Sequence, residues 1–218
     1  IIAADNSFIG FRVLANSSGI RTNWVPLNCY RHDLPVMTEN INNYTKIIYL
    51  ANPDNPTGTY FTVEEFDVFM EQVPDRVLVI LDEAYFEYAE YLENYPDSMH
   101  YRYDNVITLR TFSKAHGLAG ARVGYAICSS EIATGFDKIR LHFGVNRIAQ
   151  VGALASLGDP DFVTSVVSQV AEGRNDYALL GEEVGLPTLP SATNFVTFDA
   201  GTAGRADSIL NGLINQRV

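Results

Sequence analysis

Polar side chains that could do chemistry follow three apolar runs of the sequence. The runs are KIIYLA, VLVIL and VITLR, and the polar residues that follow them are Asn55, Asp82, Tyr85, Thr111, Ser113 and Lys114. Together they offer an amide, a carboxylate, a phenol, two hydroxyls and an amine, which can hold a small molecule and move protons. Each group stands where a buried strand would end, so a shared sheet edge would bring them together.

Lys114 is the amine of this set. A lysine can form an imine with an aldehyde and can afterwards move a proton between carbons as a general base. Arg122, eight residues later, carries a planar fork of donors that matches a phosphate, and the hydroxyls of Thr111 and Ser113 add further donors. The segment from 111 to 122 therefore predicts an anion site beside a reactive amine.

The loop NPDNPTG at 52–58 is stiffened by its composition. Pro53 and Pro56 fix φ and restrict the residue before each of them, and Gly58 can adopt backbone angles that are closed to other residues. Such a loop can hold one side chain still at the carboxyl end of a strand. We expect Asn55 to be that side chain.

Apolar runs and helical patterns alternate along the chain, which indicates an α/β fold with a mostly parallel sheet. Strands are predicted near 1–4, 20–27, 46–51, 77–81, 105–110, 122–128 and 194–198, and helices near 8–17, 62–72, 129–141 and 159–184. The residues from Thr62 to Glu65 form a capping box that would start the second helix. In open α/β sheets ligands bind beyond the carboxyl ends of the strands, where the polar residues stand. We place a domain boundary near Gly158.

Composition narrows the class of protein. The chain has 218 residues, of which 47% are hydrophobic and 19% charged, enough to bury a full core. A net charge of -11 argues against nucleic acid or an anionic membrane as a partner. No apolar run is long enough to span a bilayer. Cys29 and Cys128 are too few for a disulfide scaffold and indicate a reducing cytoplasm, and neither cysteines nor histidines show metal-ligand spacing.

The ordered set of motifs resembles the fold-type I aminotransferases that use pyridoxal 5'-phosphate (PLP), and among these the histidinol-phosphate aminotransferases most. The matching segments are SFIGF, NPDNPTG, LDEAY, TFSKAHGLAGARVGY and SATNF. The resemblance implies a large PLP-binding domain at 1–158, sandwiched by helices, and at 159–218 an interdomain helix and the first part of a small α+β domain. It also implies a cytoplasmic homodimer of histidine biosynthesis that transfers an amino group between histidinol phosphate and 2-oxoglutarate.

The resemblance assigns roles to the residues around the cofactor ring. It implies that Lys114 forms the Schiff base with PLP, that Asp82 contacts the pyridine nitrogen, and that Asn55 and Tyr85 hold the phenolic oxygen. Electron withdrawal into the ring works best with a protonated pyridine nitrogen, which a carboxylate favours. Glu83 would point to the opposite face of the strand, so only Asp82 is expected to reach the ring.

The resemblance also assigns the rest of the cofactor site. Thr111, Ser113 and Arg122 would bind the phosphate, and Phe8 would stack on the ring, where its aromatic face suits that contact. The family's glycine-rich loop, a tyrosine from the partner subunit and the arginine that binds the substrate carboxylate are expected outside residues 1–218. The chain begins without methionine, and we expect it to be part of a longer protein.

Other functions use the same motifs. The alternatives are another PLP enzyme of this fold, such as an aromatic aminotransferase, a decarboxylase of a phosphorylated amino acid or a β-lyase, and an aminotransferase-like ligand-sensing domain of a regulator. The intact set around Lys114 favours an aminotransferase. Two nearby features have structural interpretations: we expect His116 to be a packing residue of a helix or turn and the acidic stretch 87–93 to be a solvated face.

Overall fold

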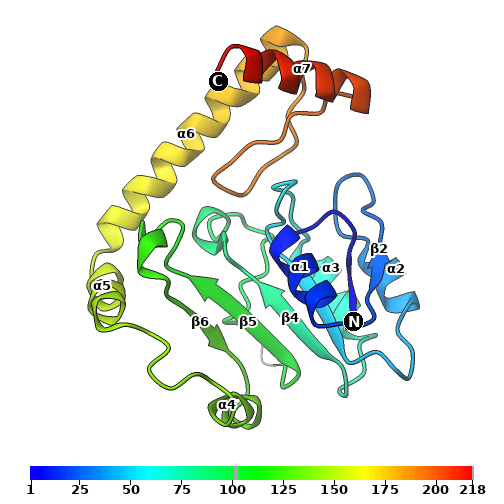
Figure 1. Cartoon of the computed structure of the whole chain (residues 1–218), viewed down its shortest axis with the longest axis vertical. Helices are drawn as coiled ribbons and strands as arrows, with labels where there is room; N and C mark the ends of the chain where they lie inside the picture. Colours follow the sequence, from blue (N-terminus) through cyan, green and yellow to red (C-terminus); the bar gives the residue numbers. More distant parts are fainter. Residues whose placement is uncertain (101–102, 218) are drawn as a thin grey trace.

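The computed structural model describes residues 1–100 and 103–217, and its centre is a six-stranded sheet with the order β2-β1-β3-β4-β5-β6 (Figure 1). The strands are β1 (Ile2–Ala4), β2 (Asn23–Val25), β3 (Ile47–Ala51), β4 (Leu78–Asp82), β5 (Val106–Thr111) and β6 (Gly124–Ile127). Neighbouring strands from β2 to β5 are parallel, and β6 is antiparallel to β5. The predicted α/β fold class is confirmed.

Helices cover both faces of this sheet. The helices of this part are α1 (Ile9–Ser17), α2 (Leu34–Glu39) and α3 (Val63–Met70). Ile48 and Leu50 of β3 belong to a core that includes residues of α2 and α3. Tyr49 and Ala51 alternate with them and pack on the other face with Phe11 of α1. The predicted sandwich of helices is thereby confirmed. Tyr49 lies on the same face of the sheet as Asp82, one of the polar residues predicted at the strand ends.

The capping box predicted at the start of α3 is present. The Thr62 side chain accepts a hydrogen bond from the backbone N–H of Glu65, and the Glu65 carboxylate accepts one from the backbone N–H of Thr62. Two otherwise unpaired N–H groups of the first turn are satisfied in this way. The helix therefore begins at Val63, as predicted, and ends at Met70.

Four helices follow the sheet: α4 (Ser130–Asp137), α5 (Arg147–Leu157), α6 (Pro160–Val184) and α7 (Ala203–Asn215). The long helix predicted from 159 is confirmed as α6: the Asp159 side chain accepts a hydrogen bond from the Phe162 N–H at its start, and Gly185 ends it with φ +66°. In Figure 1, α6 runs away from the sheet, α7 lies near its far end, and the loop between them turns back toward the sheet. The division into domains at Gly158 stays a prediction.

The predicted strand at 194–198 is wrong. Within that segment only Phe198 takes part in β-pairing, as an isolated antiparallel bridge with Thr188. The Ser191 hydroxyl donates a 2.7 Å hydrogen bond to the Phe195 carbonyl, which closes a bend in the chain. A strand needs a partner along its length, and among the described residues the β-pairing of this segment is limited to the single bridge with Thr188.

The short helix α2 and the direction of β6 lay outside the predictions. Asp33 caps the start of α2, where its side chain accepts a hydrogen bond from the Val36 N–H, and a proline stands in the first turn. β6 joins the sheet against the direction of its neighbour, so the chain doubles back after β5. Over the described residues, no helix combines the length and apolar character needed to cross a membrane.

Candidate active site

A small pocket opens at the carboxyl ends of the central strands. Its lining includes Phe8, Tyr49, Asn55, Asp82, Tyr85 and Lys114. Five of these were predicted as site residues from the sequence, and they come from four separate stretches of the chain. They meet because β1, β3, β4 and β5 are parallel and adjacent, so their carboxyl ends lie along one edge.

Asp82 is the carboxylate of the pocket and ends β4. Its carboxylate accepts hydrogen bonds from the Tyr49 hydroxyl at 2.7 Å and from the Ala84 backbone N–H at 3.2 Å. Burial raises the pKa of Asp82, and the two hydrogen bonds and the charge of Lys114 oppose that rise. A further cation or N–H donor beside this partly buried carboxyl would stabilise its ionised form.

Glu83 points away from the pocket, as the strand alternation predicts. Its carboxylate accepts hydrogen bonds from the Arg110 guanidinium at 2.8 Å and from the Ser98 N–H at 3.3 Å. Arg110 also pairs with Asp97 at 2.8 Å, and its guanidinium lies 3.4 Å from the Phe86 ring centroid. Glu83 is therefore part of a buried ion-pair network on the opposite face of the sheet. Of these two neighbouring carboxylates, only that of Asp82 lines the pocket.

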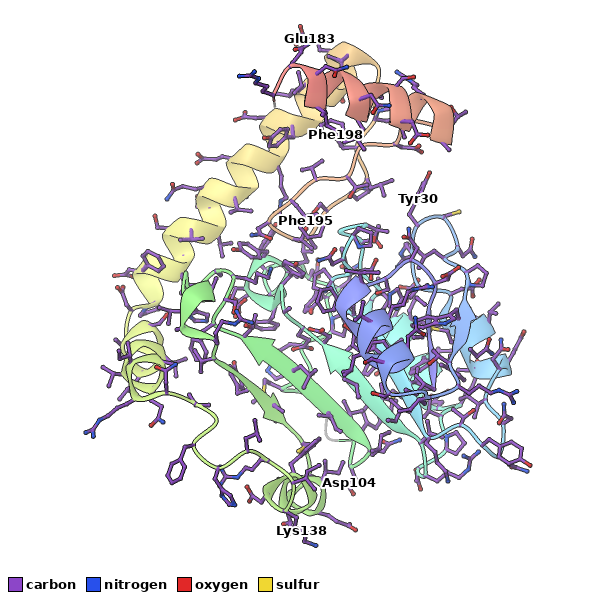
Figure 2. The ribbon with its side chains drawn as sticks, in the orientation of Figure 1. Tyr30, Asp104, Lys138, Glu183, Phe195 and Phe198 are labelled. Carbon is purple, nitrogen blue, oxygen red and sulfur yellow. The ribbon has the colours of Figure 1, made fainter. Side chains whose placement is uncertain are left out.

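Asn55 and Tyr85 meet across the pocket. The Asn55 amide donates a 3.1 Å hydrogen bond to the Tyr85 hydroxyl, and the Lys114 amine lies 5.0 Å from the centroid of the Tyr85 ring. The Phe195 ring stands edge-on to Tyr85 at 5.4 Å, on the loop that returns from α6 toward the sheet (Figure 2). The SATNF motif thus contributes packing behind Tyr85 and fixes its ring.

The NPDNPTG loop is also held by the loop that follows α6, through contacts between Gly58 and residues 191–192. Gly58 has φ +78°, and a Cβ there would come within 2.5 Å of the Ser191 hydroxyl oxygen. The Ala192 N–H donates a 2.8 Å hydrogen bond to the Gly58 carbonyl. Glycine is required here both by the backbone angle and by the close approach, and both contacts fix the loop that carries Asn55.

Lys114 is presented by a compact turn after β5. The Ser113 N–H donates to the Thr111 hydroxyl at 3.1 Å, the Gly117 N–H donates to the Lys114 carbonyl at 2.9 Å, and the Leu118 N–H donates to the Phe112 carbonyl at 2.9 Å. Gly117 closes the turn with φ +70°. These bonds keep the amine at the end of β5, facing the pocket lining.

The predicted phosphate ligands lie beside the pocket and are not part of its lining. Thr111 ends β5 and pairs with Gly124 of β6, which places Arg122 next to the same strand end. The Arg122 backbone is left-handed with φ +56°, and its guanidinium donates a 2.7 Å hydrogen bond to the Ala119 carbonyl. The role of Thr111, Ser113 and Arg122 in anion binding stays a prediction.

Sequence reasoning missed Tyr49 as a site residue. The signal was available: Tyr49 is the one aromatic residue in the run KIIYLA, and it shares a strand face with Ala51. In the sheet, Ala51 pairs in register with Asp82, so Tyr49 lies one step along the same face from the carboxylate. Finding this contact requires the strand order and register, which the pattern of one strand does not contain.

His116 and Glu87 can be compared with their expected roles. His116 bonds through Nδ1 to the Ser156 hydroxyl at 2.7 Å, and its ring lies tilted against that of Phe112 with a centroid distance of 4.8 Å, which confirms it as a packing residue. The expectation of a solvated face is wrong for Glu87, which is buried, with one oxygen 3.4 Å from His116 Nε2. The side chain turns inward because η1 (Phe86–Tyr88) packs beneath α6.

The pocket combines an amine, a partly buried carboxylate, a phenol and an amide with aromatic side chains in its walls. This set can bind a flat, polar ring, pair with a protonated ring nitrogen through Asp82 and move a proton through Lys114. Within the described ranges, no cluster of three or more histidine, cysteine or acidic side chains could hold a metal ion.

The chain is similar in sequence to curated aminotransferases, in agreement with the chemistry of the pocket. The chain is 45% identical over 174 residues to histidinol-phosphate aminotransferase 2 of Carboxydothermus hydrogenoformans, covering 79% of the chain and 48% of that protein. It is 41% identical over 203 residues to histidinol-phosphate aminotransferase 2 of Hydrogenovibrio crunogenus, covering 92% of the chain and 54% of that protein. The chain thus spans about half the length of the curated relatives it matches.

A solved structure shows the same fold. The crystal structure of histidinol-phosphate aminotransferase from Sinorhizobium meliloti in complex with pyridoxal-5'-phosphate aligns with a TM-score of 0.92 and 37% identity, covering 99% of this chain and 59% of that one. The family model for aminotransferase class I and II matches residues 1–218. The resemblance inferred from the motifs is confirmed, and the chain belongs to the class I and II aminotransferase family.

Proposed function

We propose that the whole protein carrying this chain is a PLP-dependent aminotransferase that transfers an amino group between histidinol phosphate and 2-oxoglutarate. The observation that carries the proposal is the pocket itself, where Lys114, Asp82, Asn55, Tyr85 and Phe8 meet. Membership of the family and the names of the relatives at 41–45% identity support the same activity.

The pocket residues fit the cofactor. Asp82 is a partly buried carboxyl whose pKa is raised by that burial, so a protonated ring nitrogen beside it would lower the pKa again. Phe8 supplies an aromatic wall, and the Asn55 and Tyr85 pair supplies donors for a ring oxygen. The chemistry that PLP supplies when bound is an electron sink for the substrate α-carbon.

The residues of the chain then have distinct tasks. Asp82, held by the Tyr49 hydroxyl and the Ala84 N–H, keeps its carboxylate oriented toward the ring. Lys114 offers its amine for covalent attachment of the cofactor and for moving a proton at the substrate α-carbon. We assign the cofactor phosphate to Thr111, Ser113 and Arg122, which stand together at the end of β5. This assignment rests on the chemistry of their donors.

The domain organisation and the oligomeric state are part of the same proposal. Residues 1–158 would form the PLP-binding large domain, and residues 159–218 the interdomain helix and the first part of the small domain. A homodimer would complete the site, with 2-oxo acids and amino donors as small-molecule partners. Both Cys29 and Cys128 are free, in line with a reducing cytoplasm.

Substrate choice is tested by a screen of amino donors, with the half-reaction followed through the absorbance of the bound cofactor. A site built to bind a side-chain phosphate should prefer histidinol phosphate over histidinol by about 10⁴-fold, because its donors are left unpaired with the shorter compound. Equal or better rates with phenylalanine or tyrosine would move the assignment to an aromatic aminotransferase. Release of carbon dioxide would indicate a decarboxylase, and elimination of a β-substituent a β-lyase.

The sensor alternative has its own signature in the same screen. A ligand-sensing domain would bind the cofactor and yet show no half-reaction with any donor. We favour the enzyme because Lys114 and its supporting residues are all present in one pocket.

A further inference from the structure

Asp54 stands directly before Asn55 in the loop after β3, and its carboxylate is only 1% exposed. Three side chains converge on it. The Ser7 hydroxyl donates a 2.5 Å hydrogen bond to Oδ1, His32 Nε2 lies 3.2 Å from the same oxygen, and the Thr57 hydroxyl donates a 2.9 Å bond to Oδ2. A buried carboxylate with this many donors is an organised acceptor, since an unpaired one would be costly.

The bond between Ser7 and Asp54 joins two walls of the pocket. Ser7 precedes Phe8, which lines the pocket from the loop after β1, and Asp54 precedes Asn55, which lines it from the loop after β3. These loops follow neighbouring strands, yet they are 47 residues apart in the chain. One carboxylate therefore sets the distance between two side chains that would contact the same ring.

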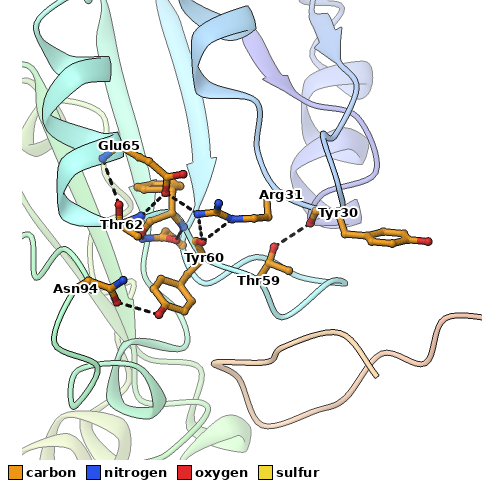
Figure 3. Close-up of polar contacts among 9 residues, drawn as sticks. Tyr30, Arg31, Thr59, Tyr60, Thr62, Glu65 and Asn94 are labelled. Atoms are coloured by element: carbon orange, nitrogen blue, oxygen red, sulfur yellow. Dashed lines mark hydrogen bonds and ion pairs between the residues drawn. The ribbon is translucent and has the colours of Figure 1, made fainter. Parts of the chain in front are cut away.

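The backbone that carries His32 is itself held in place. Figure 3 shows the Thr59 hydroxyl bonded to the Tyr30 carbonyl at 2.9 Å and the Arg31 guanidinium bonded to the Tyr60 carbonyl at 2.9 Å. Because these bonds clamp residues 30–31 onto the end of the same loop, His32 approaches Asp54 from a fixed backbone. His32 therefore holds the Asp54 carboxylate from the side opposite to its own loop, through a contact of 3.2 Å.

The charge state suits this arrangement. Burial would raise the pKa of Asp54, but the hydrogen bond and charge of His32 and the hydroxyls of Ser7 and Thr57 hold it below its ordinary value. Asp54 is therefore ionised around neutral pH, when a carboxylate can accept from all three donors at once.

We propose that Asp54 is a positioning residue that fixes Phe8 relative to Asn55 and so sets the width of the cofactor pocket. The part that concerns the cofactor rests on the proposed function. The part that concerns the two loops stands on the hydrogen bonds of this chain alone. The two parts are tested separately.

The first test uses the whole protein without cofactor and follows hydrogen–deuterium exchange of the backbone amides in residues 5–12. Ser7→Ala removes the cross-link and leaves the bonds of Asp54 to His32 and Thr57, so those amides should exchange about tenfold faster. Asp54→Asn should do the same. Thr202→Ala is the matched control: it removes a hydroxyl that caps α7, far along the chain from the pocket. Unchanged exchange in Ser7→Ala would overturn the proposal.

The second test measures the PLP dissociation constant and the visible circular dichroism of the bound cofactor. Ser7→Ala should weaken binding about tenfold and change the dichroism, while Thr202→Ala changes neither. Faster exchange with unchanged cofactor affinity and dichroism would overturn the role toward the cofactor. If the unmodified protein binds no PLP, the proposed function fails, and the exchange data still decide whether Asp54 couples the two loops.

Discussion

The hydroxyl of Tyr49 donates a 2.7 Å hydrogen bond to the carboxylate of Asp82. Burial and the nearby charge of Asp82 raise the pKa of Tyr49 far above its ordinary value, so the phenol stays protonated and acts as a donor. The Tyr49 ring is itself stacked on Phe11 with a centroid distance of 3.9 Å, which fixes its direction. Asp82 is thus held by a neighbouring strand as well as by its own turn.

Removing that donor tests its effect on the carboxylate. Tyr49→Phe keeps the stacked ring, and loss of one hydrogen bond to a charged group should lower activity about tenfold. The Tyr49 bond lowers the pKa of Asp82, so its loss raises that pKa, and the acid limb of the pH–rate profile should move to higher pH. Tyr60→Phe is the control, since its hydroxyl bonds Asn94 away from the pocket. An unmoved acid limb would contradict the link.

The charge of Asp82 is tested directly by Asp82→Asn. The side chain is nearly isosteric, so the fold should remain, while the half-reaction should slow by at least ~10²-fold because one positioned catalytic group is lost. Rapid mixing with the amino donor measures this rate. Asp137→Asn, on exposed α4, should react like the unmodified protein. A rate for Asp82→Asn within a few-fold of the unmodified protein would rule out the role.

Lys114 is identified by chemical trapping. The chain has three lysines, Lys46, Lys114 and Lys138. Reduction of the cofactor-bound protein with borohydride should leave a pyridoxyl group on the Lys114 peptide. Lys114→Ala should abolish that adduct, and Lys138→Ala should retain it because Lys138 is an exposed residue at the end of α4 (Figure 2). A pyridoxyl group on any other lysine would move the site.

Local patterns predicted most of the elements and four residues of the pocket, because each depends on a short stretch of sequence. The fifth pocket residue, Phe8, was predicted from the family resemblance. Strand ends, the Thr62 capping box and the stiff loop around Asn55 are of this kind. Contacts between distant stretches were not predictable in this way. The bond from Tyr49 to Asp82 depends on strand register, and the bond from Ser7 to Asp54 depends on strand order.

Two wrong expectations have the same origin. The segment 194–198 contains aromatic and β-branched side chains, which are typical of a strand, but strand formation depends on a partner that one segment cannot specify. The acidic stretch after Tyr85 is rich in charge, yet Glu87 turns inward because η1 packs beneath α6. In both cases the tertiary contacts of the segment, and not its local sequence pattern, determine its structure.

Buried Glu87 leads to a prediction about stability. One of its oxygens has no hydrogen-bond partner among the described residues, and burial raises the pKa of Glu87 from 4.5 to about 7. The charged form is therefore disfavoured in the folded protein, and the free energy of unfolding should fall as pH rises from about 4.5 through 7. His116 offsets this charge little, because burial lowers the pKa of its imidazole and so favours the neutral form.

Glu87→Gln removes the destabilisation that the ionised carboxylate causes at high pH. The shift from 4.5 to about 7 corresponds to at most about 3 kcal/mol, so the variant should be more stable than the unmodified protein by about 1–3 kcal/mol at pH 8 and nearly equal to it at pH 4. Urea unfolding at the two pH values measures the difference. Glu93→Gln, at an exposed position, is the control and should change stability little at either pH. If Glu87→Gln were less stable at pH 8, Glu87 would have to be ionised and paired with a protonated His116, and the inward carboxyl would stabilise the fold through that ion pair.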